Sequence, residues 1–177
     1  MTRLFRLAAT ALALLAVAAP PADAQVGPNG FMLRVEATVA APRAQVYDAL
    51  MRIGSWWNGE HTYSGDARNM SLDVRPGGCW CEQLPGGGGI EHGRVIYVVP
   101  GETLRLSGGL GPLQEWGAIG SMTWNLVETS GVTTVQLSYG VGGFFDGGFE
   151  QIAPPVEDVL TEQLQRLKRF VETGEVD

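Results

Sequence analysis

The sequence predicts an α+β fold in which a curved antiparallel sheet wraps around one long C-terminal helix. Three observations favour this fold: a helical repeat of apolar residues near the C-terminus, alternating apolar and polar residues from about 70 to 141, and turns rich in glycine and proline between these runs. Alternation is typical of strands with one buried face, and the turns indicate antiparallel hairpins. The helix must bury its apolar stripe, and a curved sheet offers a surface for it.

The first 24 residues have the features of a secretory signal. Arg3 and Arg6 precede an apolar run over residues 7–19, and small residues stand at Ala22 and Ala24. The run is too short for an ordinary membrane span. We therefore expect cleavage after Ala24, export to the periplasm or the medium, and a mature form without a membrane span.

The mature chain is expected to be one acidic domain. The full chain has 177 residues with 12 Lys and Arg against 19 Asp and Glu, and cleavage leaves 153 residues with a formal charge of −8. That length is ordinary for one domain with its own core. The negative charge disfavours nucleic acid and anionic lipid as partners. We expect a tether over 25–30, the domain over 31–174 and a short tail over 175–177.

Each element of the domain has its own signal. A first strand is expected over 31–39, then a helix that opens at Pro42, and a second short helix that Ser55 caps and that carries Trp56 and Trp57. Further strands are expected at about 70–74, 79–84, 90–99, 103–107, 121–127 and 133–141. The last helix follows Pro155 and ends at Gly174. Its apolar face consists of Val156, Val159, Leu160, Leu164, Leu167, Phe170 and Val171.

Four short motifs carry a family resemblance. They are Ala41-Pro42 with the following Val46-Tyr47-Asp48-Ala49-Leu50, the Trp56-Trp57 pair, the Pro76-Gly77-Gly78 turn, and the terminal Leu160, Leu164 and Leu167. Together they resemble the START-like, or Bet v 1-like (SRPBCC), superfamily, and particularly its branch named after the activator of Hsp90 ATPase. The resemblance covers residues 31–174 and implies a helix-grip fold. The superfamily includes carriers and polyketide cyclases, so the resemblance alone does not choose between binding and catalysis.

The name of that branch does not transfer to this chain as a function. Hsp90 and its ATP are cytosolic, whereas this sequence carries an export signal. The glycine run over 86–89 also lacks the lysine and hydroxyl of a phosphate-binding loop, and it links two strands. No cofactor is predicted.

Alternation sorts the side chains of the sheet into two faces. If Leu84 pairs with Ile90 across the glycine turn, Glu82 lies opposite His92, and Arg94 shares their face. This inner face is mainly apolar and is covered by the last helix. The side chains expected to contact a ligand are Trp56, Trp57, Trp80, Glu82, His92, Arg94, Ile96, Leu106, Met122, Trp124, Leu137, Tyr139, Phe144, Leu160 and Leu164.

Three polar residues on this inner face call for an explanation, because unpaired buried charge is costly. Glu82 can pair with Arg94 while His92 hydrogen-bonds nearby. Alternatively, the three side chains anchor the carboxylate, carbonyl or hydroxyl of a ligand at one end of an apolar pocket. In the third interpretation His92 moves a proton and Glu82 orients it, which makes these two residues the catalytic candidates.

Two further segments are expected near the pocket. Trp56 and Trp57 lie where the short helices meet the sheet, at the pocket mouth, with one tryptophan packed in the core and the other free to contact ligand. The segment 142–148 combines several glycines with Phe144 and Phe145, and it is expected to form a movable lid.

Cys79 and Cys81 are the only two cysteines of the chain. On an extended strand, residues two apart lie about 6.6 Å apart between their Cα atoms, which is unfavourable for a disulfide unless the strand is bulged. Four states of the pair remain open: two reduced structural thiols, a strained or redox-active disulfide, an intermolecular disulfide, or part of a metal site with His61. No metal site is predicted, since too few further ligands exist.

Three functions follow from these patterns. The first is an exported carrier for a small hydrophobic molecule, lipid- or polyketide-like. The second is a cofactor-independent cyclase, isomerase or hydrolase that uses His92 and Glu82. The third is a protein-interaction module or homodimer, with an outer apolar patch of Val95, Tyr97 and Val99 next to the cysteines.

Overall fold

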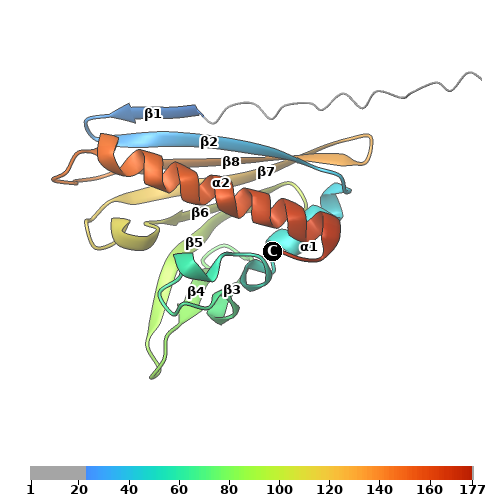
Figure 1. Ribbon diagram of the computed structural model, residues 1–177, viewed down its shortest axis with the longest axis horizontal. Helices are drawn as coiled ribbons and strands as arrows, with labels where there is room; N and C mark the ends of the chain where they lie inside the picture. The colour runs from blue at the N-terminus through green and yellow to red at the C-terminus, as the bar shows by residue number, and fades with distance from the viewer. Residues whose placement is uncertain (1–22, 177) are drawn as a thin grey trace, which may run out of the picture.

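The computed structural model describes residues 23–176 and has the α+β helix-grip architecture that the alternation predicts (Figure 1). One antiparallel sheet of eight strands curves around the long C-terminal helix α2 (Phe149–Thr173). The strands are β1 (Asp23–Gly27), β2 (Gly30–Val39), β3 (Met70–Leu72), β4 (Cys79–Gln83), β5 (Gly89–Val99), β6 (Thr103–Gly108), β7 (Ile119–Thr129) and β8 (Val132–Gly142). Their order across the sheet is β1-β2-β8-β7-β6-β5-β4-β3.

Short helices fill the connections between the strands. Helix α1 (Arg43–Leu50) follows β2, and three single-turn helices precede β3: η1 (Ile53–Ser55), η2 (Gly59–His61) and η3 (Ala67–Asn69). A fourth, η4 (Gly111–Leu113), lies between β6 and β7. Pro42 is the N-cap of α1 and has extended backbone, as expected for a proline that opens a helix.

The core lies between the concave face of the sheet and α2. Leu160, Leu164 and Leu167 of α2 are buried against inner-face side chains of the central strands. In Figure 1, α2 runs at a shallow angle to β2 over the face of the sheet, and its main backbone contacts with strands are to β2 and β1. Trp56, Trp57, Trp80 and Trp124 form a continuous aromatic cluster between the short helices and the sheet, with ring centroids 5.0 to 6.0 Å apart.

Helix α2 begins earlier than the sequence indicates. We expected it to follow Pro155, but it starts at Phe149, so that Pro154 and Pro155 lie inside it. These prolines cannot donate helix hydrogen bonds to Glu150 and Gln151, whose side chains are exposed on the water-facing side. Gly174 ends the helix in the left-handed conformation, as predicted, and its amide donates to Phe170 at 3.0 Å.

The segment expected to be a tether is part of the sheet. Residues 23–27 form β1, which pairs with β2 in a register that runs from Asp23 opposite Arg34 to Gly27 opposite Gly30. Residues 1–22 of the predicted signal lie outside the described residues. Cleavage after Ala24 remains a prediction, and it would remove the first two residues of this strand.

The predicted pairing of β4 and β5 is wrong, because the turn between them closes from Leu84 to Gly88 and a bulge follows it. Glu82 lies opposite Ile90, not His92, and His92 is the extra residue where the register shifts between Trp80 and Cys81. The bulge advances the alternation by one residue, so His92 and Val95 point inward while Arg94 points outward. A second bulge between Val95 and Tyr97 leaves Ile96 half exposed. The predicted outer patch therefore loses Val95.

Cys79 and Cys81 form a disulfide with each other across the intervening Trp80. Their Cα atoms are 5.3 Å apart, which is closer than the spacing of a fully extended strand. The local contraction of β4 coincides with the register shift next to Trp80. The sequence allowed the bond only with a bulge in the strand that carries the cysteines, whereas the extra residue, His92, lies in the partner strand β5. Neither reduced thiols nor a metal site at these residues agrees with the structure.

Candidate functional site

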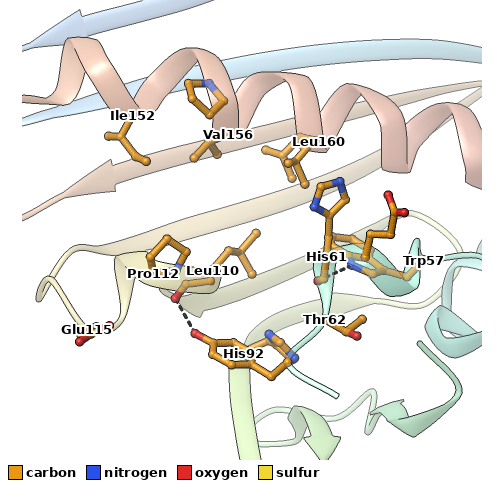
Figure 2. A pocket seen from close by; sticks show the side chains of 15 residues that line it. Trp57, His61, Thr62, His92, Leu110, Pro112, Glu115, Ile152, Val156 and Leu160 are labelled. Atoms are coloured by element: carbon orange, nitrogen blue, oxygen red, sulfur yellow. Dashed lines mark hydrogen bonds between the residues drawn. The ribbon is translucent and has the colours of Figure 1, made fainter. Parts of the chain in front are cut away.

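A cavity of about 440 Å³ lies under the N-terminal half of α2 (Figure 2). Its walls come from three places: the inward side of α2, the segment around η2, and the segment around η4. Its apolar lining consists of Trp57, Leu110, Pro112, Ile152, Pro155, Val156, Val159 and Leu160. Its polar lining consists of Glu60, His61, Thr62, Tyr63, His92 and Glu115. Apolar walls with few polar groups are typical of a small-molecule site.

A buried glutamate–histidine pair stands at the inner end of this cavity. The Glu82 carboxylate and His92 Nε2 are 2.8 Å apart, and their side chains are 0 % and 4 % exposed. The same carboxylate accepts hydrogen bonds from the backbone amides of Tyr63 at 3.1 Å and Ser64 at 2.5 Å. Glu82 itself does not line the cavity, whereas His92 does. The pair therefore presents an imidazole to the cavity, with a carboxylate behind it.

The surroundings set the protonation of the two partners. Burial alone would raise the pKa of Glu82, but hydrogen bonds from Ser64, Tyr63 and His92 outweigh it and lower this pKa below the usual value. Burial lowers the pKa of His92, and the adjacent carboxylate only partly offsets that effect. At neutral pH we therefore expect an ionised Glu82 beside a neutral His92.

The neutral imidazole must carry its proton on Nε2. An ionised carboxylate only accepts hydrogen bonds, so Nε2–H donates to Glu82 and the lone pair lies on Nδ1. Among the described residues, none hydrogen-bonds Nδ1. This atom is also not one of the fully buried side-chain atoms that lack a hydrogen-bond partner. The ring is held by Trp80 at 5.2 Å and Tyr63 at 6.0 Å between centroids. His92 thus offers an oriented acceptor to the cavity.

Tyr63 spans the mouth of the cavity close to His92. Its hydroxyl donates to the carbonyl of Gly111 at 2.9 Å, which ties the segment after η2 to η4. Tyr139 holds the same region from below: its hydroxyl donates to Gly108 at 2.9 Å and accepts from the amide of Leu110 at 3.2 Å. Burial raises the pKa of Tyr139 to about 12, so it stays a neutral donor.

The η2 side of the mouth is fastened to α2 by polar contacts. The side-chain amide of Asn58 donates to the Glu162 carboxylate at 2.6 Å, and the backbone N–H of Asn58 donates to the side-chain oxygen of Gln163 at 2.8 Å. His61 Nε2 contacts the other oxygen of Glu162 at 3.0 Å. The Arg166 guanidinium donates to the carbonyl of Trp56 at 3.0 Å. These bonds fix the position of Trp57 and of η2 over the cavity.

Only part of the predicted ligand-contact set lines the cavity. Trp57, His92 and Leu160 do so. A second group is buried in the core and shapes the cavity indirectly: Trp56, Trp80, Glu82, Leu106, Met122, Trp124, Leu137, Tyr139 and Leu164. The division of the tryptophan pair, with Trp56 fully buried and Trp57 at the cavity, follows the expectation for these two residues.

Three predicted contact residues lie elsewhere. Arg94 is on the outer face, where it pairs with Glu91 and donates to the carbonyl of Gly77 at 2.9 Å, so it does not pair with Glu82. Ile96 is half exposed because of the second bulge. Phe144 is 74 % exposed, and no residue of the expected lid 142–148 lines the cavity. Its neighbour Phe145 turns inward instead and packs on Trp116 at 4.4 Å.

The residues that sequence reasoning missed come mostly from irregular segments. Glu60 and His61 belong to η2, and Thr62 and Tyr63 follow it. Leu110, Pro112 and Glu115 lie in or beside η4. Such segments have no periodicity that would assign their side chains to a face. By contrast, Val156 and Val159 belonged to the predicted apolar stripe of α2, and their place in the cavity wall could have been found from it.

No cluster of three or more His, Cys, Asp or Glu residues suited to a metal ion occurs within residues 23–176. Within the same range, none of the helices combines the length and the apolarity needed to cross a membrane.

Solved structures with the same fold are found in several bacteria. EF2215 from Enterococcus faecalis has a TM-score of 0.63 at 15% identity, over 88% of this chain and 80% of its own. CalU16 from Micromonospora echinospora has a TM-score of 0.59 at 18% identity, over 89% and 88%. CV1439 from Chromobacterium violaceum has a TM-score of 0.55 at 20% identity, over 80% and 96%. At these identities the likeness shows the fold alone.

No curated protein matches the sequence significantly. Residues 40–172, however, match the model of the family described as Activator of Hsp90 ATPase homolog 1-like protein. This range includes α1, the strands from β3 to β8 and nearly all of α2, and it contains every residue that lines the cavity. The chain therefore belongs to the Activator of Hsp90 ATPase homolog 1-like family, within the START-like superfamily.

Proposed function

We propose that this protein is an exported carrier that binds a small, largely apolar molecule in the cavity under α2. The observation that carries the proposal is the cavity itself, with about 440 Å³ of space, mainly apolar walls and one oriented imidazole at its inner end. A site of this size and composition can bury a molecule with two or three fused rings or a short lipid. Export rests on the signal-like sequence of the first 24 residues.

Filling the cavity tests this proposal. Val159 lines the cavity from α2, so Val159→Trp should block it, whereas Asp158→Trp adds the same side chain at an exposed position of the same helix. We expect wild type and Asp158→Trp to bind the neutral dye Nile red with a strong rise in fluorescence. Val159→Trp should weaken that binding at least tenfold. Equal binding by both variants would place the dye outside the cavity and contradict the proposal.

A second candidate function is proton transfer within the same cavity. It is favoured by the Glu82–His92 arrangement, in which a carboxylate orients a neutral imidazole with a free lone pair. Hydrolysis and enolate chemistry also need donors that stabilise a developing oxyanion. The side-chain donors that line the cavity already bond to protein atoms and are not free to stabilise an oxyanion. For this reason we favour the carrier function over the enzyme function.

The two functions separate in a His92→Gln variant. Under the enzyme hypothesis, this change abolishes exchange of carbon-bound protons of a cyclic β-diketone in D₂O, measured by NMR, while dye binding persists. Under the carrier hypothesis, wild type shows no exchange above buffer.

The outer face supports a protein-interaction function less well. Val95 is buried, and the Tyr97 ring is partly covered by the guanidinium of Arg105 at 5.2 Å. A homodimer stays a prediction, and sedimentation at high concentration tests it.

A further inference from the structure

The hydrogen-bond donors that line the cavity are already used inside the protein. Trp57 Nε1–H donates to the carbonyl of His61 at 3.2 Å, and the Thr62 hydroxyl donates to Gly59 at 2.7 Å. The Tyr63 hydroxyl donates to Gly111 at 2.9 Å. The Nε2–H groups of the two histidines point at carboxylates, His61 at Glu162 and His92 at Glu82. A ligand acceptor would therefore find these side-chain protons occupied.

The side-chain groups that remain available to a ligand are acceptors. His92 Nδ1 has a free lone pair, and the oxygens of Thr62 and Tyr63 keep lone pairs after donating their protons. Glu60 and Glu115 add carboxylates at the exposed rim. The indole N–H of Trp80 does lack a partner, but Trp80 packs against the His92 ring and does not line the cavity.

The permanently charged side chains that line the cavity are all acidic. Among the described residues that line it, two are glutamates and none is lysine or arginine. Arg94, which the sequence offered as an anchor for a carboxylate, lies on the outer face with Glu91. A ligand carboxylate would meet no lysine or arginine in this cavity, and the His61 ring is already paired with Glu162. Burying a carboxylate there would therefore be costly.

From this inventory we infer that the cavity selects an apolar molecule whose polar group is a hydroxyl, an alcohol or a phenol, and rejects carboxylates. The inference rests on the proposed function and names its ligand class. The ligand hydroxyl donates to His92 Nδ1, while His92 Nε2–H donates to Glu82. The two hydrogen bonds form a chain in which each strengthens the other. The structure thus narrows the three ligand groups that the sequence left open to one.

Three probes of nearly equal shape test this selectivity at pH 7.5: 2-naphthol, 2-methoxynaphthalene and 2-naphthoate. The first donates a hydrogen bond, the second only accepts, and the third is an anion that only accepts. Their dissociation constants are measured by displacement of Nile red from the wild-type protein. We expect 2-naphthol to bind at least about tenfold more tightly than either competitor, since each of them leaves Nδ1 without a partner.

Two variants assign the selectivity to His92. His92→Phe removes the acceptor and should bring the three affinities within about twofold of one another, while Tyr97→Phe on the outer face should keep the wild-type ratios. Where His92→Phe does not fold, the wild-type ratios alone decide. Similar affinity for all three probes, or tightest binding of 2-naphthoate, overturns this inference and leaves the proposed carrier function intact. If none of the probes binds and Nile red is not bound either, both are overturned.

Discussion

The protein contains two histidine–glutamate pairs that are alike in geometry and opposite in surroundings. His92 and Glu82 are 2.8 Å apart with side chains 4 % and 0 % exposed, whereas His61 and Glu162 are 3.0 Å apart with side chains 33 % and 39 % exposed. Both pairs adjoin the same cavity, one at its inner end and one at its mouth. Distance alone would rank them equally.

Burial makes the difference between them. The Glu82 carboxylate has given up its water and replaced it with three protein donors, so removing one partner leaves the others unpaired in the core. Glu162 keeps access to water, and exposed pairs contribute little to folding. The inner pair therefore has a fixed orientation, as a binding or catalytic group requires, while the outer pair mainly holds η2 against α2.

The largest expected effect comes from removing each glutamate in turn. Glu82→Ala should lower the free energy of unfolding by about 3–5 kcal/mol, because it strands His92 and two backbone amides in the core. Glu162→Ala should cost about 1 kcal/mol or less. Urea denaturation of the two variants measures both values, and equal losses would mean that burial does not distinguish the pairs.

A smaller effect is expected in the pH dependence of stability. The pKa of His92 is lowered in the folded protein, so below about pH 6.5 the unfolded chain takes up a proton that the folded chain refuses. Stability should then fall by up to about 1.4 kcal/mol per pH unit until the folded pKa is reached. The pKa of Glu82 is also lowered, so its contribution is complete above about pH 4.5 and is lost as the pH falls through the folded value.

The His92→Gln variant isolates the histidine part of this profile. Its unfolding free energy should change less between pH 7 and pH 5.5 than that of wild type, while Tyr97→Phe should follow wild type. Parallel curves for wild type and His92→Gln would show that His92 is not held neutral by its surroundings.

The smallest effect on ligand binding should come from reducing the Cys79–Cys81 disulfide, which lies on the face of β4 that points away from the Glu82 side chain. Reduction of the Cys79–Cys81 disulfide removes only a very short loop closure, which is worth about 1–2 kcal/mol in the chain-entropy model. The dissociation constant for 2-naphthol should change less than twofold, because the cysteines do not line the cavity. Titration before and after treatment with a phosphine reductant measures this. A large loss of affinity would mean that the disulfide positions His92.

The fold followed from the sequence because its signals are periodic. The alternating strands and the stripe that includes Leu160, Leu164 and Leu167 predicted the sheet and α2. The bulges left no such signal, and each of them reversed the facing of the residues that follow it. This is why Arg94 was placed inside and Val95 outside.

The site was predicted less completely than the fold. Glu82 and His92 were expected to be neighbours, and they are, although the pairing that suggested it is shifted and His92 reaches Glu82 from a bulge. The mouth could not be predicted, since Tyr63, Leu110 and Glu115 lie in irregular segments that only the assembled fold brings together. Which donors of the cavity are already hydrogen-bonded could not be predicted either. This depends on bonds such as that from the Tyr63 hydroxyl to the Gly111 carbonyl, which link segments far apart in the chain.

Native mass spectrometry of the protein purified from its own host tests whether the cavity holds a small apolar molecule. We expect an added mass that disappears on denaturation and belongs to a hydroxyl-bearing apolar compound. This mass should be absent from Val159→Trp but present in Asp158→Trp. A protein at its bare mass that also fails to take up Nile red would show that the cavity carries no such molecule, and a cargo retained by Val159→Trp would show that it binds elsewhere.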